Sequence, residues 1–190
     1  SLLKEFCLCI DDYGLKKKHI IAANEGNAIA LAAGYYFAEK SIPMVYMQNS
    51  GLGNAINPLL SLCDSDVYAI PMLIMIGWRG EPGFKDEPQH NVKGKITEKI
   101  LKLLNIKYSI LRTKKDLIKF DKQIKFAKKN NSIVACLIEK GTLEKEKSLI
   151  MKKDFYNLNK EFFLKKLLEN VNKKTKIISS TGYNSREIMY

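Results

Sequence analysis

Short apolar runs alternate with longer segments in which apolar residues recur every three or four positions. The runs predict strands, since buried parallel strands are nearly continuous in apolar residues. They span 19–23, 43–48, 71–77, 107–111 and 133–139. The periodic segments predict helices over 2–13, 24–39, 53–62, 95–104 and 115–129. Strands separated by helices of this length are typical of an α/β fold with a doubly wound parallel sheet.

The pattern changes near Gly141, and this predicts a domain boundary. Residues 1–141 form the first predicted domain, and the charged, irregular residues 142–155 form a linker. A helix over 158–172 and a strand over 176–179 then begin a second α/β unit, residues 156–190, which we expect to be truncated.

Charge does not predict a nucleic-acid-binding protein, although the formal net charge is +12. The basic residues are nearly all lysines, spread over several predicted helices without the interleaved aromatic residues that stack on bases. The longest charge-free stretch near the start, 26–38, is too short for a membrane span. Four cysteines without a Cys-x-x-Cys pair indicate buried thiols in a reducing, cytoplasmic compartment.

Glu25 is the first candidate for chemistry, because it follows an apolar run and opens a helix that Asn24 can cap. An acid in a first helical turn can simply complement the helix dipole. Its position favours a further role, since ligands of open α/β sheets bind at the carboxyl ends of the strands.

Two later loops follow strands and are expected at the same edge of the sheet. The sequence 49–53, Asn-Ser-Gly-Leu-Gly, lacks the third glycine of a dinucleotide-binding turn, because Ile56 occupies that place. It can also be a tight turn without a ligand. The long loop 77–91 carries Arg79, which can bind an anion in a bidentate manner, and Lys85. Either cation can instead pair with a nearby acid, Glu81, Asp86 or Glu87, and this is what we expect of Lys85.

Together these segments resemble a known family. The likeness rests on Asn24-Glu25-Gly26-Asn27-Ala28, on residues 47–58, on Gly77-Trp78-Arg79-Gly80-Glu81-Pro82-Gly83, on Lys85-Asp86-Glu87-Pro88-Gln89-His90 and on residues 180–187. They resemble the thiamine-diphosphate-binding fold, in particular phosphonopyruvate decarboxylases and the related sulfopyruvate decarboxylases. The resemblance implies a pyrimidine-binding domain over 1–141 without its first strand, then the beginning of a diphosphate-binding domain.

The resemblance also implies roles for individual residues. Glu25 would hydrogen-bond the aminopyrimidine ring and so promote deprotonation of the thiazolium carbon, as a catalytic and cofactor-binding residue. His90 would act in catalysis, although a lone loop histidine is often a bystander. The implied cofactor-binding residues are Glu25, Asn49, Ser50, Gly51, Thr181, Gly182 and Ser185, and the implied substrate-binding residues are Arg79, Gln89 and His90. An ordinary capped helix start explains Ser185 equally well.

The implied reaction is thiamine-diphosphate-dependent decarboxylation of phosphonopyruvate to phosphonoacetaldehyde and CO2, in phosphonate biosynthesis. We expect an anionic 2-oxoacid substrate and a homo-oligomer with active sites between subunits, without nucleic-acid or membrane partners. Magnesium would be bound outside this chain, which we expect to be an incomplete enzyme by itself. The alternatives are a sulfopyruvate decarboxylase or other 2-oxoacid decarboxylase subunit, and a non-catalytic, lysine-rich α/β binding module.

Overall fold

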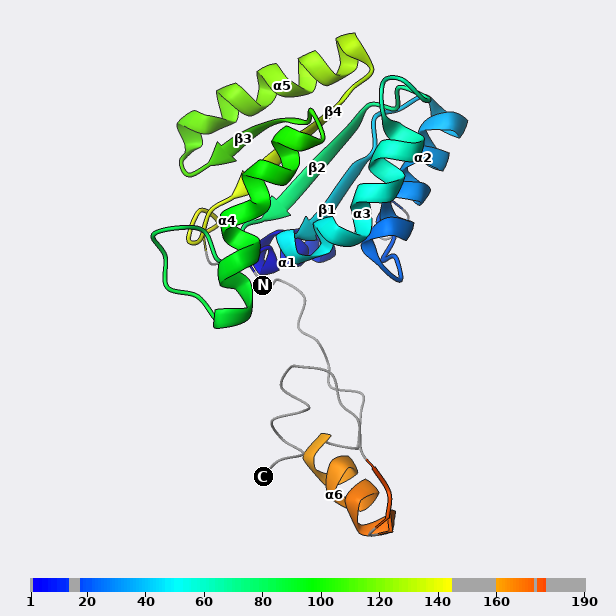
Figure 1. The fold of residues 1–190 in the computed structure, drawn as a ribbon, viewed down its shortest axis with the longest axis vertical. Helices are drawn as coiled ribbons and strands as arrows, with labels where there is room; N and C mark the ends of the chain where they lie inside the picture. Colours follow the sequence, from blue (N-terminus) through cyan, green and yellow to red (C-terminus); the bar gives the residue numbers. More distant parts are fainter. Residues whose placement is uncertain (1, 14–17, 145–159, 173, 177–190) are drawn as a thin grey trace. The chain divides into compact units, whose positions relative to one another are not determined.

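A parallel four-stranded sheet forms the centre of residues 1–150, the first of two units into which the chain divides (Figure 1). This computed structural model describes residues 2–13, 18–144, 160–172 and 174–176. The strands are β1 (Met44–Gln48), β2 (Met72–Gly77), β3 (Lys107–Leu111) and β4 (Ile133–Ile138), in the order β1-β2-β4-β3. All three pairings are parallel, which confirms the predicted sheet.

Helices cover both faces of this sheet. They are α1 (Lys4–Asp12), α2 (Glu25–Glu39), α3 (Leu52–Pro58), α4 (Pro88–Leu103) and α5 (Leu117–Asn130). One core joins α2, α3 and α4 to alternate strand residues such as Ile74 and Leu137, all fully buried. A second core lies on the opposite face of the sheet. There Leu3, just before α1, and Phe120, in α5, belong to the same cluster as Cys136 of β4. The doubly wound α/β prediction is therefore confirmed.

The predicted strand over residues 19–23 is wrong. This segment forms no β-ladder, and Ile20 and Ile21 are 71% and 87% exposed. It lines, together with the edge strand β1, a largely apolar groove of about 740 Å³. An apolar run favours a strand only where a neighbouring backbone supplies hydrogen bonds, and no described segment does so here. Among the described residues, the hydrogen bond between His19 Nε2 and Tyr46 Oη, 2.7 Å, links the segment to β1.

The loop after β2 is shorter than the sequence pattern predicts. Helix α4 begins at Pro88 instead of residue 95, because proline at the first helical position has its φ angle preset and needs no hydrogen-bond partner for its nitrogen. Gln89 and His90 therefore lie in the first turn of a helix. The helix that starts after the turn at 49–51 also differs in detail, since α3 continues as one π-helical segment, Leu59–Cys63.

In the second unit, the structure describes helix α6 (Lys160–Asn170), which agrees with the predicted helix over 158–172. Residues 177–179 of the predicted strand lie outside the described residues, as do Thr181, Gly182 and Ser185. Within the described part of the chain, no helix has the length and apolar character needed to cross a bilayer.

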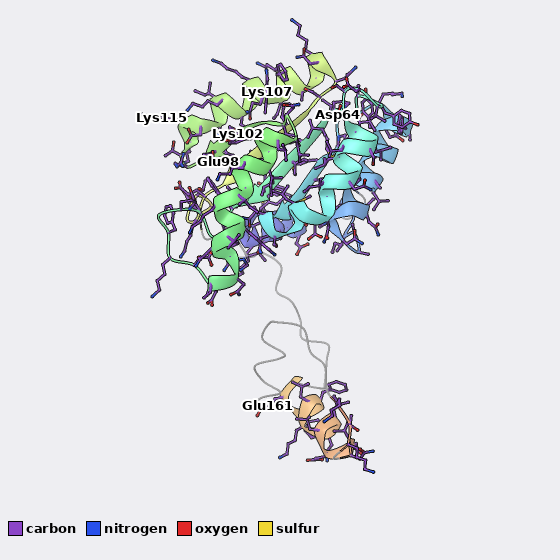
Figure 2. The ribbon with its side chains drawn as sticks, in the orientation of Figure 1. Asp64, Glu98, Lys102, Lys107, Lys115 and Glu161 are labelled. Atoms are coloured by element: carbon purple, nitrogen blue, oxygen red, sulfur yellow. The ribbon has the colours of Figure 1, made fainter. Side chains whose placement is uncertain are left out.

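The exposed lysines of the first unit are distributed over different elements. Lys102 lies on α4, Lys107 on β3 and Lys115 in the 3-10 turn Lys114–Asp116, and Figure 2 labels all three. The ammonium of Lys107 also lies 3.6 Å from the centre of the Phe126 ring. These lysines are exposed to water on several different elements, as their spacing in the sequence predicts.

Candidate active site

Polar side chains gather where the parallel strands end. The turn 49–51 follows β1, the segment 78–87 follows β2, Arg112 follows β3 and Glu139 follows β4. All strands of a parallel sheet end at the same edge, so segments far apart in the sequence meet there. Helices α2, α3 and α4 begin close to these segments.

Glu25 is the first residue of α2, and its carboxylate is held by a neighbouring helix. Asn24 caps α2, since its side-chain oxygen accepts a hydrogen bond from the backbone N–H of Asn27, 2.9 Å. The Oε2 atom of Glu25 accepts a hydrogen bond from Asn54 Nδ2 on α3, also 2.9 Å. The side chain is half-buried and lines the groove beside β1. Among the described residues Glu25 forms no ion pair, so its second oxygen can accept a hydrogen bond from a ligand.

Gly51 is in direct contact with this carboxylate. A Cβ atom at Gly51 would lie 2.5 Å from Glu25 Oε1 and 2.6 Å from its carboxyl carbon, distances that real side chains do not tolerate. A side chain at this position would therefore displace the Glu25 carboxylate from where it lies. The structure thus brings two predicted cofactor-binding residues together, although they are 26 positions apart. Ser50, which precedes Gly51 in the turn after β1, accepts a hydrogen bond from Gln48 Nε2 at 2.9 Å.

Asn49 is buried, and its amide joins three segments. Its Nδ2 donates to the backbone oxygen of Arg79 (2.8 Å) and to Thr97 Oγ1 (2.9 Å), and its Oδ1 accepts from the backbone N–H of Arg79 (3.1 Å). Both amide hydrogens are therefore used within the protein. Asn49 thus holds the segment after β2 in place through the backbone of Arg79. A direct contact between Asn49 and a cofactor stays a prediction.

The guanidinium of Arg79 is bound by Asp86 in the same loop. Its Nε donates to Oδ2 of Asp86 at 2.8 Å, and its Nη2 donates to Oδ1. Asp86 also accepts from the backbone N–H groups of Gly80 and Glu87, both at 2.8 Å. The hydrogen bonds from Arg79 hold the pKa of Asp86 well below its usual range. Arg79 can therefore present only its remaining donors to an anion, and its substrate role stays a prediction.

His90 lies in the first turn of α4, beside this ion pair. Burial lowers its pKa, and the positive charge of Arg79 lowers it further, so the imidazole is neutral near pH 7. Its Nδ1 is buried and has no hydrogen-bond partner among the described residues. Gln89 is exposed, and so is Lys85, whose backbone oxygen accepts from Lys140 Nζ at 3.2 Å.

A charged cluster at three strand ends was not predicted from the sequence. Arg112 lies between two carboxylates, with Nη2 3.4 Å from Glu81 Oε1 and Nε 3.1 Å from Glu139 Oε2. Burial, with the negative charge of Glu139 second, raises the pKa of Glu81 to about 7. The sequence could have indicated this cluster only through position, because Glu81, Arg112 and Glu139 each follow the end of a different strand.

The fold and the site define a parallel α/β domain in which the carboxylate of Glu25 lies against Gly51 at the carboxyl edge of the sheet. The profile of the family "Thiamine pyrophosphate enzyme, N-terminal TPP binding domain" matches residues 3–100, and the chain belongs to this family.

Individual relatives are similar over about half of the chain. Phosphonopyruvate decarboxylase from Streptomyces viridochromogenes is 40% identical over 94 residues, which are 50% of this chain and 23% of that protein. Sulfopyruvate decarboxylase subunit alpha from Methanococcus maripaludis is 36% identical over 105 residues, 55% of this chain and 60% of that subunit. The corresponding subunit from Methanothermobacter thermautotrophicus is 36% identical over 95 residues, 50% of this chain and 55% of that subunit. The match thus spans less than two thirds of each of these relatives.

Proposed function

We propose that this chain takes part in thiamine-diphosphate-dependent decarboxylation of an anionic 2-oxoacid, with Glu25 as the group that engages the cofactor. Membership of the thiamine pyrophosphate enzyme family supports the cofactor. The similarity to enzymes named phosphonopyruvate and sulfopyruvate decarboxylase supports the reaction class. The observation that carries the proposal is the carboxylate of Glu25, which has one oxygen fixed by Asn54 and the other without an ion-pair partner among the described residues.

The geometry around Glu25 fits an aminopyrimidine ring. A carboxyl group can exchange a proton with a ring nitrogen if it is held within hydrogen-bonding distance and shielded from competing cations. Gly51 allows close approach of the backbone to the Glu25 carboxyl group, which the amide of Asn54 holds without adding a positive charge. When bound, thiamine diphosphate supplies the electron sink for the carbanion that remains after CO2 leaves. Thr181, Gly182 and Ser185 are proposed to contact its diphosphate.

Phosphonopyruvate is the proposed substrate, and it would give phosphonoacetaldehyde and CO2 after uptake of a proton. Arg79, Gln89 and His90 are the proposed substrate-binding residues, and a neutral His90 can accept a proton or donate one from a ring N–H. The proposed setting is phosphonate biosynthesis in the cytoplasm. We further propose a homo-oligomer with active sites between subunits and Mg²⁺ bound outside the described residues.

Sulfopyruvate is the second candidate, because the alpha subunits of sulfopyruvate decarboxylases match a similar part of the chain. Both substrates carry a tetrahedral anionic group beside the oxoacid, so the described residues can serve either one. Substrate choice therefore has to be measured directly.

The test is CO2 release by the complete assembled protein with thiamine diphosphate, Mg²⁺ and each oxoacid in turn. We expect turnover of phosphonopyruvate and a fall of at least about 100-fold in kcat for Glu25→Gln, because an amide cannot exchange the proton. Glu39→Gln, on the same helix and exposed, is the matched control. Turnover of sulfopyruvate alone would establish the second candidate. Full CO2 release by Glu25→Gln would refute the role of Glu25, and no CO2 release by the wild type with either oxoacid would favour a binding module.

A further inference from the structure

Asn54 is the one described side chain that the structure shows bonded to the Glu25 carboxylate. It lies in the first turn of α3, while Glu25 opens α2, so the hydrogen bond joins the starts of two neighbouring helices. We infer that Asn54 is a positioning residue for Glu25, which holds the carboxylate in the orientation that the proposed reaction needs. This inference rests on the proposed function and adds a residue to its machinery.

Packing keeps the two helix starts at the distance that this hydrogen bond requires. A Cβ atom at Gly26 would lie 2.9 Å from the backbone oxygen of Asn54, so the start of α2 lies directly against α3. Gly51 contacts the Glu25 carboxyl group as well, with its Cβ position 2.5 Å from Oε1. The carboxylate is thus bounded by Gly51 and oriented by the amide of Asn54.

The chemical identity of residue 54 matters, because a carboxylate accepts hydrogen bonds and an amide nitrogen donates them without carrying a charge. A lysine or arginine at this place would hold the carboxylate by a full positive charge and oppose its protonation. The neutral amide fixes one oxygen and leaves the group free to share a proton with a ring nitrogen.

Fold stability gives no comparable reason for an asparagine at this position. The side chain of Asn54 is exposed, so it fills no core. Asparagine is also a weaker helix former than alanine by about 0.5 kcal/mol. Asn57, on the same helix and also exposed, forms no side-chain hydrogen bond that the described part of the structure shows, and it is the matched control.

The experiment measures exchange of the thiazolium C2 proton of thiamine diphosphate in D2O by quenched-flow NMR, on the complete assembled protein. No oxoacid is present, so the readout is separate from decarboxylation. We expect Asn54→Ala to slow exchange by about 10- to 100-fold, the loss that corresponds to one hydrogen bond to a charged group. Asn57→Ala should exchange at the wild-type rate, and cofactor affinity by calorimetry should change less than exchange does.

Asn54→Asp separates positioning from folding. An acid in the first turn of α3 interacts favourably with the helix dipole, so a thermal melt should show a folded protein. Exchange should nevertheless be slow, because the new carboxylate cannot donate to Glu25 and repels it. Asn54→Gln, which keeps the donor on a longer and exposed side chain, should recover part of the rate.

Wild-type exchange rates in folded Asn54→Ala and Asn54→Asp, together with slow exchange in Glu25→Gln, would overturn the inference and leave the proposed function standing. If the wild-type protein itself does not accelerate exchange over free cofactor, both the proposed function and the inference are refuted. Slow exchange in Asn54→Ala and in Asn57→Ala alike would also overturn the inference, because the effect would then belong to the helix.

Discussion

Replacing Glu81 by glutamine tests the electrostatics of the cluster at the strand ends. Glu81 is only 5% exposed, and its Oε2 atom has no hydrogen-bond partner among the described residues. Two carboxylates share the guanidinium of Arg112, so the cluster carries an uncompensated negative charge once Glu81 and Glu139 are both ionised. Glutamine has nearly the same shape and removes that charge.

The raised pKa of Glu81 gives the sign and the size of the effect. In the folded protein burial raises the pKa of Glu81 to about 7, against about 4.5 for an unperturbed glutamate. Between these two values the folded protein binds more protons than the unfolded chain, so the free energy of unfolding falls as the pH rises. At about 1.4 kcal/mol per pH unit, this interval corresponds to at most about 3.5 kcal/mol.

Urea unfolding at pH 5, 6, 7 and 8 measures this difference. We expect Glu81→Gln to have a stability close to that of the wild type near pH 5 and to exceed it by about 2 to 3 kcal/mol at pH 8. Glu39→Gln, at an exposed site, should follow the wild type throughout. If the difference in free energy of unfolding between Glu81→Gln and the wild type is the same at pH 5 and pH 8, Glu81 is ionised across this range. That result would contradict the reasoning from burial.

Two further substitutions test how the segment after β2 is held. A methyl group at Gly94 would overlap the carbonyl oxygen of Gly80, so Gly94→Ala should lower stability by about 3 kcal/mol or more in a thermal melt. Gly53→Ala, where a Cβ atom meets nothing within 4 Å, is the control, and equal melting temperatures would disprove the close contact. Asp86→Ala should cost about 1 to 3 kcal/mol near pH 7, because it frees Arg79 and two backbone N–H groups. That cost should shrink as the pH falls below about 4, where unfolded aspartate takes up its proton, and a pH-independent cost would contradict the ion pair.

Local patterns in the sequence were sufficient for most of the secondary structure. The runs that became the two central strands, β2 and β4, are continuous in apolar residues because both faces of the sheet are covered. The cap Asn24 and the acid Glu25 were recognisable because a helix start depends on neighbours within three positions. The run at 19–23 shows the limit of this approach, since its neighbours in space decide whether it pairs.

Tertiary structure decided which polar groups meet. Asn54 and Glu25 are 29 positions apart, and Arg112 and Glu81 are 31 positions apart, so no local pattern connects them. Arg79 could have bonded any of several nearby acids, and the geometry of its loop selected Asp86. Residue types and spacing thus determined where helices and strands form and which edge of the sheet carries chemistry. The contacts at that edge depend on strand order and helix packing, because these bring distant segments within hydrogen-bonding distance.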